Sequence, residues 1–155
     1  MQNPPPGQQE YGNAYNPPPP GTSQKSAVGL EPNIAAALSY IWIVGLIFFV
    51  MEKENRFIRF HALQSILYGV LWIVAVIVLS IVNVIIAIVF GVVASAAGDA
   101  GAFVGMIVWL ISMFIWLVFP LVYVGTLILA AVKAYQGKTF KLPIIGNMAE
   151  RMVNK

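Results

Sequence analysis

Apolar residues in this chain gather into three long runs that contain no charged side chain. The runs cover residues 34–51, 62–97 and 102–132. Their apolar positions are continuous and do not alternate with polar ones, which is typical of membrane helices and not of barrel strands. About 18 helical residues span roughly 27 Å, close to the hydrocarbon thickness of a bilayer. The pattern therefore predicts an all-α integral membrane protein with three transmembrane helices, at about 33–51, 62–97 and 102–133.

The second and third runs are longer than the roughly 20 residues that one crossing needs. Each could be one long tilted helix, or the second could fold into two short crossings at residues 80–83. Asn83 lies between two valines without Gly or Pro beside it, which is a poor turn signal. Residues 95–101 are small and flexible and include Asp99, so one helix on each side of them is the better interpretation.

Both ends of the chain are polar. Residues 1–32 hold all but two of the ten prolines, among Gln, Asn and Gly. Such sequence buries too little apolar surface to offset the entropy of ordering it. We expect a disordered Pro-rich tail over residues 1–32, a three-helix transmembrane domain over residues 33–145, and a short basic tail over residues 146–155.

Composition and charge placement support a membrane location. Hydrophobic residues make up 59% of the chain and charged residues 10%, which is more apolar sequence than a small soluble body can hide. With three crossings, the first loop and the C-terminal end share one face, which collects eight of the nine Lys and Arg. The positive-inside rule places that face in the cytoplasm. We expect a multi-pass protein of the prokaryotic cytoplasmic membrane, with its N-terminus outside and its C-terminus cytoplasmic.

The first polar motif covers residues 52–65, between the first two apolar runs. As a helix it has an aromatic and polar face with a basic edge. These positions are Phe57, Phe60, His61 and Gln64 on the face, and Arg56 and Arg59 on the edge. We expect an interfacial segment before the second helix, with rings in the acyl boundary and guanidinium groups at the phosphates. Its role stays open between anchoring and a functional site at His61 and Gln64, as a proton relay, lipid-headgroup contact or docking site.

The second polar motif follows the third apolar run. Gly137 is expected to end the helix there, and Pro143 to prevent it from resuming earlier. Lys138 and Lys141 flank Phe140, which again places an aromatic ring among cations at the lipid headgroups. On the three-helix topology both motifs lie on the same cytoplasmic face, where they could pack together or share a partner.

Several kinds of chemistry find no support in the residues. The chain has no cysteine, and its one histidine, His61, has no acid at metal-ligand spacing on the helix. Its serines are scattered and form no nucleophile–base–orienter set. The basic residues form no long run or face for nucleic acid. We therefore expect no metal or cofactor, no enzymatic activity and no nucleic-acid partner.

Three patterns carry a resemblance to a known family. They are Asn33-x-x-Ala36-x-Leu38-Ser39-Tyr40, Arg56-Phe57-x-Arg59-Phe60-His61-Ala62-x-Gln64-Ser65 and Gly137-Lys138-x-Phe140-Lys141-x-Pro143-Ile144-x-Gly146. From Asn33 to about Arg151 the chain resembles the Tic20-like small membrane proteins, whose prokaryotic members are catalogued as domains of unknown function. The family's plant members belong to the protein-import machinery of the chloroplast inner envelope and are usually drawn with four helices, one more than expected here.

Two functions follow from these observations. The first is a non-enzymatic subunit or scaffold that helps proteins insert into, cross or assemble in the membrane, as the resemblance implies. Its partners would be membrane lipids and either further copies of the chain or other membrane proteins. The alternative is a small transporter or channel subunit, which would need polar residues lining a route through the membrane, with Ser80, Asn83, Ser112 and Thr126 as the candidates.

Overall fold

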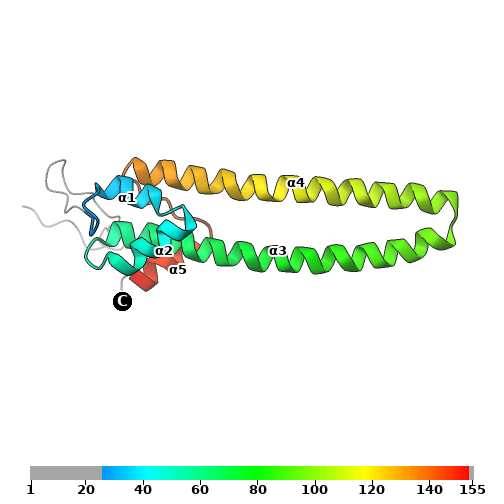
Figure 1. Cartoon of the computed structure of the whole chain (residues 1–155), viewed down its shortest axis with the longest axis horizontal. Coiled ribbons are helices and arrows are strands. Elements are labelled where there is room, and N and C mark those ends of the chain that lie inside the picture. Colours follow the sequence, from blue (N-terminus) through cyan, green and yellow to red (C-terminus); the bar gives the residue numbers. More distant parts are fainter. Residues whose placement is uncertain (1–25, 154–155) are drawn as a thin grey trace, which may run out of the picture. The chain divides into compact units, whose positions relative to one another are not determined.

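The computed structural model describes residues 26–153, and over that range the chain is helical and contains no strand. Its elements are α1 (Pro32–Leu38), α2 (Trp42–Met51), α3 (Arg56–Ala96), α4 (Asp99–Tyr135) and α5 (Ile145–Val153) (Figure 1). The chain divides into two compact units. Among the described residues, the first unit comprises 26–67 and 128–153, and the second comprises 68–127.

The Pro-rich tail expected over residues 1–32 lies outside the described residues up to position 25. Residues 26–30 form a turn, in which the Ser26 N–H donates to the Leu30 carbonyl (2.9 Å) and the Leu30 N–H donates to Ser26 Oγ (3.0 Å). Pro32 then opens α1, where its missing N–H costs nothing. The last part of the tail is therefore a structured lead into the first helix.

The prediction of one spanning helix over residues 33–51 is wrong, because α1 and α2 are separate short helices. Between them, the N–H groups of Tyr40 and Ile41 donate to the carbonyls three residues earlier, whereas an α-helix uses the carbonyl four residues earlier. Ile41 has an extended backbone (φ −80°, ψ 111°). Ser39 Oγ donates to the Ala35 carbonyl (2.8 Å), a side-chain bond that competes with the helical ladder. The ten residues of α2 measure only about 15 Å.

The two ends of the α1–α2 segment meet. The N–H of Ala27 donates a hydrogen bond to Glu52 Oε2 (2.8 Å), although 25 residues separate them. A helix that crossed the bilayer between these positions would hold them about 30 Å apart. The two ends of the segment therefore lie beside each other, and three crossings are not confirmed.

The next helix, α3, begins earlier than the expected residue 62. Asn55 caps its N-terminus, since Oδ1 accepts the N–H groups of Phe57 (3.1 Å) and Ile58 (3.4 Å) and satisfies two donors that a helix start leaves unpaired. The segment expected to lie separately in the interface is therefore, from Arg56 onward, the first turns of α3 itself.

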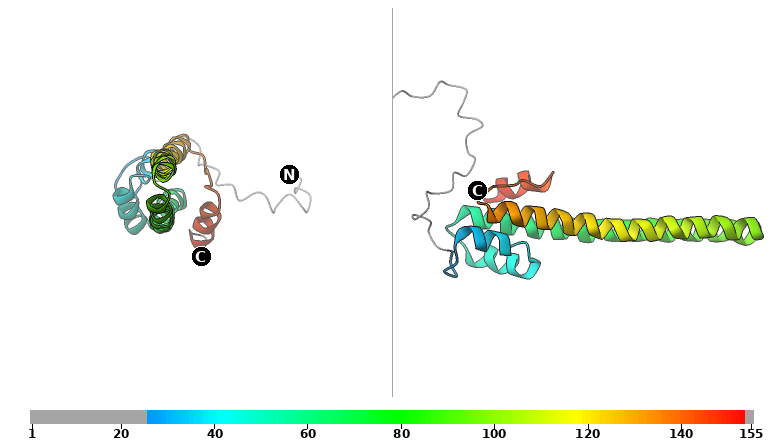
Figure 2. Two further views of the ribbon diagram at one scale, coloured as in Figure 1. Left: turned by 90° about the vertical axis from the view of Figure 1, so that its right-hand side faces the viewer. Right: turned by 90° about the horizontal axis from the view of Figure 1, so that it is seen from above.

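Helix α3 is the centre of the first unit, with α2 on one side of it and α5 on the other (Figure 2). On the α2 side, Phe48 packs with Ile58 and Ala62. On the α5 side, Phe60 and Leu63 pack with the inner face of α5, Ala149 and Val153. The segment expected to be a short C-terminal tail from residue 146 is thus helical over its described length, because its small and apolar side chains recur every four residues.

The second unit is an antiparallel hairpin made of the remainder of α3 and of α4 (Figure 1). Only residues 97 and 98 separate the two helices, and Gly98 has φ +55°, a left-handed conformation that glycine adopts without strain. Gly101 approaches Ala94 so closely that a Cβ would overlap the Ala94 carbonyl oxygen. The turn predicted within residues 95–101 is confirmed.

Polar and aromatic side chains join the two helices of the hairpin. Asn83 Nδ2 donates to Ser112 Oγ (2.9 Å), 29 residues further along the chain. The Trp72 ring stacks on Phe119 and on Tyr123, each at 4.3 Å between centroids. Because α3 continues without a break through Asn83, the alternative of two short crossings at residues 80–83 is wrong.

Both long helices are long and apolar enough to cross a membrane. With 41 and 37 residues they measure roughly 60 and 55 Å, about twice the hydrocarbon thickness. Pro120 lies inside α4, which continues past it to Tyr135. The Val, Ile and Leu side chains on the outside of the second unit are largely exposed, as expected for a surface that faces lipid.

Candidate functional site

A buried polar cluster lies at the centre of the first unit. Tyr40, from the turn between α1 and α2, meets His61 and Gln64 of α3. The Tyr40 hydroxyl lies 2.9 Å from His61 Nδ1 and accepts a hydrogen bond from Gln64 Nε2 (2.7 Å). Tyr40 is 7% exposed and the other two side chains are 0% exposed. Polar groups removed from water in this way need partners, and each of the three side chains hydrogen-bonds to another.

The protonation state of the cluster follows from these contacts. Burial raises the pKa of the Tyr40 phenol above its usual range, so the hydroxyl keeps its hydrogen. The same hydroxyl accepts from Gln64 and is hydrogen-bonded to His61 Nδ1, where the donor is set by the imidazole tautomer. His61 Nε2 is buried beside the Lys138 backbone but has no hydrogen-bond partner of good geometry among the described residues.

Aromatic rings surround His61. Phe57 and Phe60 meet the imidazole edge-on, at 4.6 and 5.1 Å between centroids, and Tyr40 does so at 5.7 Å. Such edge-to-face arrangements are the favourable ones for aromatic pairs. The phenylalanine rings expected in the acyl boundary are therefore buried inside the protein and form part of its core.

The two polar motifs pack together, as the sequence allowed. Gln64 Nε2 donates to the Phe140 carbonyl (3.0 Å), and Gln64 Oε1 accepts the Leu142 N–H (3.3 Å). The side-chain amide thereby donates one hydrogen bond to the backbone of the loop after α4 and accepts one from it, as a peptide group of a neighbouring strand would. Gln64 is the residue that connects α3, the α1–α2 turn and this loop.

The loop is placed by the end of α4. The Gly137 N–H donates to the Ala134 carbonyl (2.9 Å) and the Lys138 N–H to the Lys133 carbonyl (3.0 Å), the pair of bonds that terminates a helix at a left-handed residue. Gly137 has φ +72° and lies against the Asn33 side chain of α1. The expectation that Gly137 ends the helix is confirmed.

The charged members of the motifs lie outside this cluster. Arg56 and Lys138 are exposed, and Lys141 forms an exposed salt bridge with Glu150 (2.9 Å). The Arg59 guanidinium lies 5.9 Å from the centre of the Phe49 ring. Pro143 is exposed in the turn before α5. The exposed cations Arg56, Lys138 and Lys141, here called the basic rim, are therefore separate from the buried polar and aromatic cluster, and Arg59 is half-buried.

Sequence reasoning gave no role to three residues that complete the site. In the sequence, Tyr40 stands out only as part of the family pattern, but in the structure its hydroxyl is hydrogen-bonded to both His61 and Gln64. Gly45 approaches Ser39 and Ser65 so closely that a Cβ would lie 2.5 Å from Ser65 Oγ. Glu52 is buried and holds backbone N–H groups on both sides of the α1–α2 segment. A buried acid in an apolar context gives no periodic signal, so the sequence could not reveal it.

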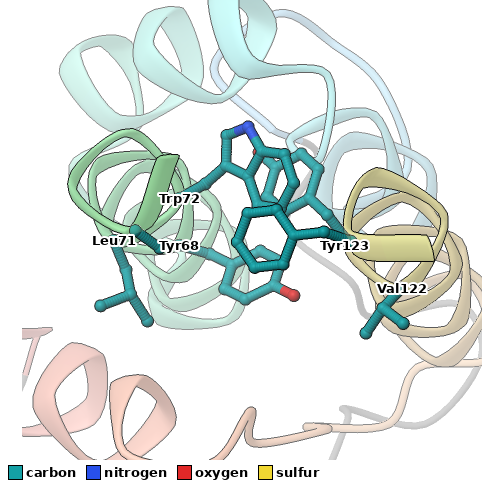
Figure 3. A pocket seen from close by; sticks show the side chains of 7 residues that line it. Tyr68, Leu71, Trp72, Val122 and Tyr123 are labelled. Atoms are coloured by element: carbon teal, nitrogen blue, oxygen red, sulfur yellow. The ribbon is translucent and has the colours of Figure 1, made fainter. Parts of the chain in front are cut away.

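An apolar cavity of about 150 Å³ lies in the second unit. It is lined by Tyr68, Leu71, Trp72, Ala75, Phe119, Val122 and Tyr123. Figure 3 shows the Trp72 and Tyr123 rings lying between the two helices of the hairpin. The Tyr68 hydroxyl is hydrogen-bonded to Thr126 Oγ1 beside it. Since the Trp72 ring stacks on Phe119 and Tyr123, we interpret this cavity as space left by the packing of the two helices and not as a ligand site.

Comparison with known proteins identifies the family. Residues 31–149 match the sequence profile of the MamF/MmsF magnetosome magnetite crystal formation protein family. The chain belongs to that family. The matched range begins at α1 and ends within α5, so it includes every residue of the buried cluster. The Tic20-like name that the sequence patterns suggested is not confirmed.

Relatives in archaea are membrane proteins. A UPF0132 membrane protein of Methanocaldococcus jannaschii is 35% identical over 82% of this chain and 93% of its own length. A second one from the same organism is 35% identical over 81% of this chain and 72% of its own length. A UPF0132 membrane protein of Archaeoglobus fulgidus is 30% identical over 80% of this chain and 97% of its own length. No solved structure matches the chain. This protein is thus a small membrane protein, helical and without strands over residues 26–153, with two long apolar helices.

Proposed function

We propose that this protein is a non-enzymatic structural subunit of the prokaryotic cytoplasmic membrane, which assembles with further copies or with other membrane proteins. The observation that carries the proposal is the burial of Tyr40, His61 and Gln64. The three side chains hydrogen-bond to one another, and Gln64 also bonds to the loop after α4, so the cluster holds three chain segments in place. The exposed surfaces are the apolar side chains of the hairpin and the basic rim. They are suited to packing against other membrane helices and to docking of partner proteins.

The proposed topology has two crossings, made by α3 and α4, with both ends of the chain on the cytoplasmic side. Between Arg59 and Lys133 the only charged residue is Asp99, next to the hairpin turn. All nine Lys and Arg therefore fall on one side of two crossings, against eight of nine for three crossings. The positive-inside rule favours the arrangement with two. The contact between Ala27 and Glu52 also supports two crossings. In this proposed topology the N-terminus is cytoplasmic, whereas the sequence alone led us to expect it outside.

Protease accessibility tests this topology. Epitope tags at the two termini are both expected to resist protease added outside intact spheroplasts and to be cleaved after lysis. A tag inserted between Ala97 and Gly98 is expected to be cleaved from outside. Cleavage of the N-terminal tag alone in intact cells would restore the three-crossing arrangement.

Site-directed crosslinking tests the assembly. The chain contains no cysteine, so single cysteines placed in turn along residues 84–93 of α3 report only on themselves. If copies pack through the hairpin, oxidation in native membranes should yield dimers with a period of about 3.6 residues. Crosslinking that captures neither a second copy nor another protein at any position would contradict the proposal.

A small transporter or channel subunit is the alternative function. It is supported by the hydrogen-bonded pair Asn83 and Ser112, which places polar groups inside the apolar hairpin. Proteoliposomes that show ion or solute flux, lost on changing Asn83 to Ala, would favour this function. Flux that equals the protein-free background would remove it.

A further inference from the structure

The turn before α5 holds a backbone conformation that its central residue rarely adopts. Ile144 has φ +68°, and the Ile145 N–H donates to the Pro143 carbonyl (2.8 Å) across it, which closes a three-residue turn. A β-branched residue in the left-handed region is strained, whereas glycine takes this conformation freely. The Ile144 side chain is also 77% exposed, so contacts within the protein do not compensate the strain. Strain of this kind in an exposed residue is a sign that the Ile144 side chain contacts something other than the protein itself.

The segment that contains Ile144, residues 138–153, carries exposed apolar and exposed basic side chains. Met148 and Met152 are about half exposed on α5, whose opposite face packs on α3. Arg151 is exposed on the same helix, and Lys138 is exposed in the preceding loop. Lys141 is paired with Glu150, whereas Lys138 and Arg151 form no salt bridge with any residue between 26 and 153.

We propose that residues 138–153 bind anionic phospholipid headgroups, with Ile144 inserted among the acyl chains. Cations beside exposed apolar side chains match the boundary between phosphates and acyl chains. A lipid surface is favoured over a second copy because α5 has only nine residues, and a stable protein interface takes roughly 800 Å² from each partner. The proposal deepens the membrane role given above and rests on it.

Lipid contact can be measured with a single fluorophore. Ile144→Cys in the full chain is labelled with an environment-sensitive dye and reconstituted into vesicles of phosphatidylcholine, alone or mixed with phosphatidylglycerol. In the mixed vesicles, nitroxides on the acyl chains should quench the dye severalfold more than in phosphatidylcholine alone. Glu54→Cys, an exposed position in the loop before α3, is the matched label control and should show little quenching in either.

Two variants separate the contributions of charge and insertion. With the dye on Met148→Cys, adding Lys138→Gln and Arg151→Gln should abolish the preference for phosphatidylglycerol. Adding Ile144→Gly should reduce quenching severalfold without lowering the melting temperature in detergent, since glycine relieves the strained φ. Equal quenching in both vesicle types, or quenching that follows the protein-to-lipid ratio as a second copy would cause, would overturn the proposal.

Because both leaflets of these vesicles have the same composition, the result does not depend on orientation. Failure here would therefore leave the two-crossing topology standing, and the accessibility of the termini tests that topology separately.

Discussion

The backbone N–H of Ala27 donates to Glu52 Oε2 across a segment that contains two helices. The same carboxylate accepts the N–H groups of Glu54 (3.3 Å) and Asn55 (3.1 Å) through Oε1. One buried side chain therefore closes the α1–α2 segment and shapes the loop that leads into α3. Charge-assisted bonds of this kind are among the stronger ones in proteins.

Removing the Glu52 carboxylate should destabilise the first unit. Glu52→Ala leaves three backbone donors without their acceptor, and we expect a loss of about 3 kcal/mol in the free energy of unfolding. Glu52→Gln keeps one carbonyl oxygen and should lose about half as much. Thermal unfolding in detergent measures both, with Glu54→Gln as a control at an exposed acid two residues away. Equal stability of the Ala variant and the wild type would contradict the assigned role.

Gln64 should be needed to hold the loop after α4. Gln64→Leu keeps the size of the side chain but leaves the Phe140 carbonyl and the Leu142 N–H unpaired, at a cost of about 3 kcal/mol. The loop should then open locally, and trypsin should cut at Lys138 or Lys141 several times faster than in wild type. Gln136→Leu, at an exposed position in the same loop, should leave the cleavage rate unchanged.

Gly45 should tolerate no larger residue. A Cβ there would overlap the Ser39 carbonyl and lie 2.5 Å from Ser65 Oγ, so α2 would have to move away from α3. We expect Gly45→Ala to cost about 2 kcal/mol, in the range of other overpacking changes. Gly91→Ala is the control, because a Cβ at that glycine meets no atom within 4 Å and adds helix propensity. The melting temperatures of the two variants in detergent should therefore change in opposite directions.

The interhelical pair of the hairpin should contribute modestly. Asn83→Ala removes the hydrogen bond to Ser112, and polar bonds between membrane helices are worth about 0.6 kcal/mol on average. A double-mutant cycle with Ser112→Ala should return a coupling energy of about that size in unfolding experiments. A coupling near zero would mean that the two side chains do not pair in the membrane.

The sequence predicted the features that depend on continuous patterns. The two long apolar helices, the turn near Asp99 and the helix stop at Gly137 all agree with the structure. For the two polar motifs the sequence left open whether they pack together or share a partner, and in the structure they pack together. Hydropathy could not separate α1 from α2, because residues 34–51 are apolar enough for a crossing. What breaks that run is the tertiary contact of Tyr40 with His61 and Gln64, which connects positions more than twenty residues apart.

The short turn between α3 and α4 has a consequence for biogenesis. Because only residues 97 and 98 separate the helices, neither can remain behind while the other enters the bilayer. On the proposed two-crossing topology we therefore expect the pair to insert together as a hairpin during synthesis. In the proposed orientation a single ionised side chain, Asp99, is carried across, which keeps the electrostatic cost of translocation small.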